Sequence, residues 1–128
     1  MFQRKVLVLA ILFMLGLTCA YAADITGKWN AEFDSQVGKQ VYVFEFKVEG
    51  TKLTGNAISK IGEAPTPTTT PITEGTINGD AITFVENLDY QGMQLKIAYK
   101  GTISGDEIKL SRMVGEQEGE KFVAKRAK

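Results

Sequence analysis

Apolar and polar residues alternate one by one along most of this chain, and this period of two limits the possible folds more than any other feature. The clearest run is MQLKIAYKGTI at residues 93–103. An extended strand with this pattern carries apolar side chains or glycine on one face and mainly polar ones on the other. After residue 23, no stretch places apolar residues at helical spacing over three turns. We therefore predict an all-β fold whose strands bury one face.

The first residues do not belong to this pattern. Two basic residues at 4–5 precede an apolar run at 6–17, which is followed by the small-x-small sequence AYA at 20–22. These are the charged, apolar and cleavage regions of a secretory signal peptide. We predict a signal peptide helix at 1–22, one β domain at 23–128, and a secreted or periplasmic location.

Loss of the leader would change the available chemistry, because the sequence holds 1 Cys and no His, and Cys19 lies in the leader. The remaining domain then has no disulfide, thiolate nucleophile, Cys/His zinc site or imidazole base. Thr18 precedes Cys19, where a lipoprotein signal has Gly, Ala or Ser, so a lipid anchor is not favoured. Without Arg4 and Lys5, 13 of the 15 basic residues face 15 acidic ones, a net charge of −2 that predicts no nucleic-acid or membrane partner.

Turn signals divide the rest of the chain into about eight short segments of similar length. Antiparallel strands of this number form an up-and-down barrel or a sandwich. With no disulfide to hold the domain, its apolar core must do so alone, which favours a closed sheet. We predict an eight-stranded antiparallel up-and-down barrel with strands at 26–34, 39–48, 51–59, 72–77, 80–88, 93–103, 106–113 and 120–126.

Two nearly identical octapeptides, GTINGDAI at 75–82 and GTISGDEI at 101–108, mark two of the predicted hairpins. Asn-Gly and Ser-Gly favour two-residue turns, because such turns need positive φ angles. Turns at 78–79 and 104–105, and a looser one at 49–50, keep all apolar faces in register. They would pair Gly75 with Ile82 and Gly101 with Ile108, so that an inward glycine relieves crowding in a curved sheet.

The segment KIGEAPTPTTTP at 60–71 holds all 3 prolines of the chain. Proline cannot donate to a β ladder, so this segment is not expected to be a central strand, and it is too long for a hairpin turn. We predict an extended surface loop; a lid or binding loop at the barrel mouth is the alternative.

Few residues offer catalytic chemistry. A glycosidase needs two carboxylates that project into one cleft, and Glu86 is the single carboxylate in phase with inward neighbours. One inward carboxylate is typical of a mouth residue or a bulge. The acidic run at 116–120 lacks the ligand spacing of a calcium loop and is interpreted as a solvated hairpin tip. We predict no enzyme activity, no metal and no cofactor, with a hydrolase as the less favoured reading.

Gly27 and Trp29 begin the first strand, and Arg126 ends the last strand in phase with Phe122 and Ala124. This pattern resembles the closure of the calycin barrels, which include lipocalins, fatty-acid-binding proteins and avidins. The resemblance implies that Arg126 packs across Trp29 and seals one end, a cation–π contact worth about 0.5–2 kcal/mol. A core tryptophan and an unrelated basic tail are the alternative.

The chain from GKWNAEF to FVAKR also resembles a family of small exported bacterial β-barrel domains. The shared motifs are GKWNAEF, INGDAI, ISGDEI, IGEAPTPTTTPITEG and FVAKR, and the PTPTTT within the loop is additional to the usual pattern. Some members of that family look like accessory domains attached to secreted hydrolases. The resemblance therefore implies a calycin-like barrel with a secreted enzyme as a possible partner.

Together these features favour a non-catalytic exported barrel that binds a small molecule, a glycan or a partner protein. A periplasmic inhibitor or other protein-interaction barrel is the alternative. Since eight strands enclose little more than their own side chains, the interior is either filled or holds a small cavity. Arg112, which is also inward by phase, would either seal one end or meet an anionic ligand group. The predicted ligand-lining residues are Tyr42, Phe44, Phe46, Phe84, Leu95, Ile97 and Tyr99, with Arg112 and Glu86 as polar groups.

Overall fold

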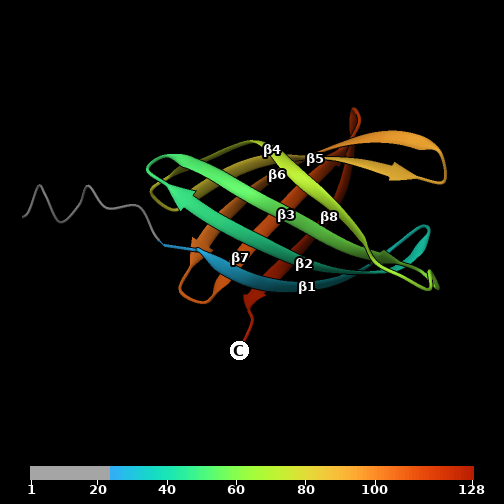
Figure 1. Ribbon diagram of the computed structural model, residues 1–128, viewed down its shortest axis with the longest axis horizontal. Coiled ribbons are helices and arrows are strands. Elements are labelled where there is room, and N and C mark those ends of the chain that lie inside the picture. Colours follow the sequence, from blue (N-terminus) through green and yellow to red (C-terminus); the bar gives the residue numbers. More distant parts are fainter. Residues whose placement is uncertain (1–23) are drawn as a thin grey trace, which may run out of the picture.

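The computed structural model describes residues 24–128, and the predicted signal peptide lies outside the described residues. Within residues 24–128 the structure is a closed barrel of eight strands without helices, each antiparallel to the next, and β1 pairs with β8 (Figure 1). The all-β, eight-stranded up-and-down architecture is thus confirmed. The strands are β1 Gly27–Ser35, β2 Gly38–Glu49, β3 Lys52–Ile61, β4 Thr68–Asn78, β5 Ala81–Tyr90, β6 Met93–Ser104, β7 Glu107–Val114 and β8 Gln117–Arg126. No helix among the described residues is long and apolar enough to span a membrane.

The two ends of the barrel differ. The β2–β3, β4–β5 and β6–β7 turns lie at one end together with the start of β1 and the end of β8; we call it the closed end, at the left of Figure 1. The other four connections surround the opposite end, which we call the mouth. Both sequence repeats lie at the closed end, so they are not part of the mouth.

The repeated hairpins form one residue further along than predicted. Their two-residue turns are Gly79-Asp80 and Gly105-Asp106, with φ angles of 57° and 61° at the glycines. Positive φ at the first central residue is what a type II′ turn requires, so the glycine sets the turn position. With the turn one residue further along, the pairing of the two strands in each hairpin shifts by two residues, so the same side chains remain buried.

The partners predicted for the two inward glycines are corrected by this shift. Ile77, not Gly75, pairs with Ile82, and Gly75 lies where the β4–β5 register shifts at a bulge. Gly101 pairs with Leu110 and also with Ile82, instead of with Ile108. Gly101 still faces large apolar side chains, as the crowding argument requires.

The predicted loop at 60–71 is much shorter in the structure, because β3 extends to Ile61 and β4 begins at Thr68. Successive β-branched threonines favour an extended strand. Pro71 lies opposite Asn56, directly before the β3–β4 register shifts. At such an irregularity the missing N–H of proline costs no regular ladder bond. The connection that remains is 62–67, at the mouth.

Side chains fill the barrel interior. The rings of Tyr42, Phe44 and Phe46 stack along β2, with centroids 5.1 Å and 5.7 Å apart. Phe84 stacks on Tyr99 at 4.5 Å and meets Phe44 edge-on at 5.7 Å. All five rings are buried, so the middle of the barrel is a packed core.

Candidate functional site

The closed end is covered by Trp29 and Arg126. The guanidinium of Arg126 lies 4.5 Å from the centre of the Trp29 ring, within cation–π distance. Trp29 Nε1 donates to the Ile25 carbonyl at 2.9 Å, and Arg126 Nε donates to Asp106 Oδ1 at 3.2 Å. The contact expected between the two residues is therefore present. Arg112 lies elsewhere and does not contribute to it.

A buried polar cluster lies under the mouth and is centred on Glu86, which is 0% exposed. Tyr42 donates its hydroxyl hydrogen to Glu86 Oε1 at 3.1 Å, and Tyr99 donates to the same oxygen at 2.7 Å. Two charge-assisted hydrogen bonds compensate part of the cost of burying a carboxylate. Glu86 is thus neither a mouth residue nor a bulge residue, in contrast to its sequence interpretation; bulges occur in β4 and at the β7–β8 pairing.

Arg112 connects this cluster to the mouth. Its Nη1 donates to the hydroxyl oxygens of Tyr42 and Tyr99, each at 3.3 Å. Its Nη2 donates to Gln40 Oε1 at 3.3 Å, and its Nε donates to Glu120 Oε1 at 2.7 Å. The hydrogen bonds therefore run without interruption from Glu86, through two phenols and one guanidinium, to the rim residue Glu120.

Burial sets the protonation of this cluster. Desolvation raises the pKa of Glu86, although both tyrosine hydrogen bonds and the charge of Arg112 oppose the shift. Desolvation followed by the nearby Glu86 charge raises the pKa of Tyr42 to about 12, and the same two causes raise that of Tyr99. Both phenols consequently keep their protons at neutral pH and remain donors to Glu86.

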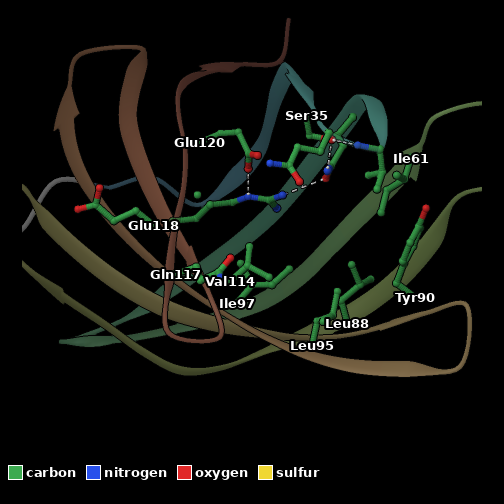
Figure 2. A pocket seen from close by; sticks show the side chains of 15 residues that line it. Ser35, Ile61, Leu88, Tyr90, Leu95, Ile97, Val114, Gln117, Glu118 and Glu120 are labelled. Carbon is green, nitrogen blue, oxygen red and sulfur yellow. Dashed lines mark hydrogen bonds and ion pairs between the residues drawn. The ribbon is translucent and has the colours of Figure 1, made fainter.

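A cavity of about 230 Å³, which we call the mouth cavity, opens above Arg112. Figure 2 shows apolar side chains such as Ile61, Leu88 and Leu95 on one part of its wall and Glu120 on another. Arg112 is 6% exposed and lines this cavity, so its guanidinium borders the space. The full lining is Ser35, Gln36, Val37, Gln40, Ile61, Leu88, Tyr90, Leu95, Ile97, Arg112, Val114, Gln117, Glu118, Gly119 and Glu120.

A second cavity of about 350 Å³ adjoins the first on the side of β3, β4 and β5; we call it the loop cavity, because the 62–67 connection forms part of its wall. The two cavities share four lining residues, which are Val37, Ile61, Leu88 and Tyr90. The mouth therefore offers two adjoining spaces with an apolar boundary between them.

The structure separates the nine interior residues predicted from the sequence into three groups. Three of them, Leu95, Ile97 and Arg112, line the mouth cavity. Tyr42, Tyr99 and Glu86 form the polar cluster beneath it, and Phe44, Phe46 and Phe84 pack in the core.

Gln40 and Glu120 complete the contacts of Arg112 and were not among the predicted site residues. Gln40 is in phase with Tyr42 on β2, so alternation alone could have indicated it. Glu120 is in phase with Phe122, but it was assigned to a solvated acidic tip at 116–120. The structure corrects that assignment for Glu120, which is partly buried against Arg112.

Comparisons of the chain with protein-family models, curated proteins and solved structures found no match. Among residues 24–128, no group of three or more Asp or Glu side chains is placed to hold a metal ion. The site is described by its own geometry: a buried arginine, paired with Glu120, lines the mouth cavity, and the loop cavity adjoins that cavity.

Proposed function

We propose that this protein is an exported, non-catalytic binding barrel that holds a small, largely apolar molecule at its mouth. The observation that carries the proposal is Arg112, a buried cation that lines a cavity whose wall is apolar on the side of Ile61, Leu88 and Leu95. Ligand sites commonly combine an apolar lining with a few well-placed polar groups. The calycin resemblance of the sequence supports the same proposal.

The hydrogen bonds of Arg112 leave one guanidinium N–H without a partner. A guanidinium has five N–H donors, and the structure uses one on Nε, two on Nη1 and one on Nη2. The remaining Nη2 hydrogen supports recognition of one acceptor atom, such as a carbonyl or hydroxyl oxygen. Four fixed hydrogen bonds orient the guanidinium before a ligand arrives, which lowers the entropic cost of binding.

The filled interior supports a shallow site at the mouth in place of a deep central one. A ligand among Phe44, Phe84 and Tyr99 would have to displace stacked rings from the core. The apolar residues around the mouth, such as Leu95 and Val114, are partly exposed and can be covered without repacking.

A non-catalytic role is supported by the state of Glu86, the one carboxylate that is fully buried among the described residues. Its carboxylate accepts hydrogen bonds from Tyr42 and Tyr99, and it has no exposure to a substrate. Glycoside hydrolysis needs a second carboxylate across a cleft from the first.

The test uses the fluorescence of N-phenyl-1-naphthylamine, a neutral apolar probe, with the purified protein. We expect saturable binding that is lost in Val114→Trp, because the indole would occupy the mouth cavity. Val123→Trp is the matched control, since Val123 faces outward on β8 and is 38% exposed. Absence of saturable binding to the wild type, or equal binding to both variants, would refute the proposal.

A further inference from the structure

Ser59 is the unusual residue of the loop cavity. Its side chain is on the inward face of β3 and is only 2% exposed, yet its hydroxyl has no hydrogen-bond partner. Among residues 24–128 it is the one buried side-chain polar atom without a partner. A buried hydroxyl in this state is unfavourable, and a bound group that reaches it would supply the missing hydrogen bond.

The charged residues around the same cavity are all acidic. Glu63, in the 62–67 connection, and Asp89, near the end of β5, both line it, and no Lys or Arg among residues 24–128 does. Asp89 Oδ1 accepts a hydrogen bond from the Gly92 amide at 3.2 Å, which fixes the carboxylate at the rim. Thr66 and Thr68 add hydroxyl groups to the wall.

From this arrangement we propose that the loop cavity binds a cationic group, such as a primary ammonium, with Ser59 Oγ as a hydrogen-bond acceptor and Glu63 and Asp89 as counter-charges. This inference rests on the proposed function, because the apolar part of the same ligand would lie in the mouth cavity. The ligand class is then a small cationic amphiphile.

The boundary between the two cavities suits such a molecule. Val37, Ile61 and Leu88 would contact its apolar chain, and Tyr90, which lines both cavities, offers an aromatic ring beside the charged end. The one cation at the mouth cavity, Arg112, contacts Glu120 at 2.7 Å and is linked through tyrosines to Glu86. Arg112 is therefore already neutralised and opposes an ammonium less than a free cation would.

An anionic group in the loop cavity is disfavoured by the same residues. It would face the two exposed carboxylates of Glu63 and Asp89 without a basic residue in the lining, and this like-charge repulsion is reduced by salt. The acidic lining therefore selects the sign of the ligand charge, while Ser59 supplies a specific acceptor position.

The experiment compares n-octylammonium, n-octanoate and octan-1-ol, each below its critical micelle concentration, by calorimetry and by displacement of N-phenyl-1-naphthylamine. We expect n-octylammonium to bind about tenfold more tightly than the other two, since it alone combines a charge-assisted hydrogen bond to Ser59 with attraction to two carboxylates. Added salt should reduce the difference.

Three variants test the assignment of residues. In the double variant Glu63→Gln/Asp89→Asn, the preference for n-octylammonium over the other two compounds should fall to about twofold or less. In Ser59→Ala, the affinity for n-octylammonium should fall, whereas the affinity for octan-1-ol should stay unchanged. Asp80→Asn/Glu107→Gln is the matched control, because it makes the same charge change at the closed end.

The outcomes separate the two proposals. Equal affinities for the three compounds, or a preference that survives Glu63→Gln/Asp89→Asn, would overturn the cation site and leave the mouth site intact. Failure of the neutral fluorescent probe and of octan-1-ol to bind would overturn the proposed function. In that case calorimetry with n-octylammonium alone still decides whether Ser59, Glu63 and Asp89 bind a cation.

Discussion

Replacing Arg112 by Met should destabilise the fold severely, because it removes the one cation from a buried cluster. The substitution keeps much of the side-chain volume on β7 but deletes the donors to Tyr42, Tyr99, Gln40 and Glu120. Removing one partner of a buried charged group costs about 3–5 kcal/mol, which is a large fraction of the stability of a small domain. We expect a loss of free energy of unfolding in this range at pH 7.

The size of the loss should depend on Glu86 and on pH. Without Arg112 the pKa of Glu86 rises further, so the carboxyl group takes up a proton and the penalty becomes smaller at pH 5 than at pH 7. In a double-mutant cycle with Glu86→Gln, the two substitutions should couple by about 1–2 kcal/mol, since they alter one hydrogen-bonded network.

Urea unfolding of the purified variants measures these quantities, provided that the m-value is unchanged. Lys109→Met is the control, because Lys109 lies on the outward face of the same strand and is exposed. A loss below about 1 kcal/mol for Arg112→Met, equal at both pH values and additive with Glu86→Gln, would refute the coupled network.

Four further substitutions have defined outcomes. Gly101→Ala should cost about 1–3 kcal/mol in urea unfolding, because its Cβ would lie 2.7 Å from the nearest Leu110 methyl carbon and 2.9 Å from Ile82; no loss would contradict the crowding. Arg126→Met should lower the melting temperature by an amount equivalent to about 0.5–2 kcal/mol through loss of the contact with Trp29, and unchanged melting would argue against a seal. Ser59→Ala should raise the free energy of unfolding by about 1 kcal/mol, because an unpaired buried hydroxyl is removed; a loss of that size would mean that the hydroxyl is satisfied. Burial raises the pKa of Glu86 from 4.5, so its stabilising contribution is present below pH 4.5 and is lost as the pH rises through the folded-state pKa. Glu86→Gln should lack this loss in urea unfolding measured across that pH range, and an unchanged pH profile would contradict the assignment.

Alternation and turn chemistry were sufficient for the strand number and the direction in which most side chains point. They placed Tyr42, Tyr99, Glu86 and Arg112 in the interior because each shares the phase of its apolar neighbours. They did not fix the exact turn residue, since Asn-Gly and Gly-Asp turns preserve the same parity and differ only in register.

The remaining differences have local causes. The proline-threonine segment at 60–71 was expected to be a loop because it holds three prolines and is too long for a hairpin turn. A register shift beside Pro71 makes the missing donor of that residue inexpensive, so β4 begins before it. Glu120 was interpreted as solvated because it lies in an acidic run, and only the position of Arg112 on the neighbouring strand shows its partner. The cavities depend on how side chains of distant strands pack together. The alternation of apolar and polar residues along the sequence does not predict this packing.

Amide chemical-shift mapping during titration with N-phenyl-1-naphthylamine tests the central claim most directly, because it locates a ligand on the barrel. We predict shifts at the mouth, at residues such as Gln36, Gly62 and Gly119, and none at the closed-end turns of Gly79 and Gly105. Shifts confined to the closed end or to the outer face of the barrel, or no shifts at saturating probe, would contradict a binding site at the mouth.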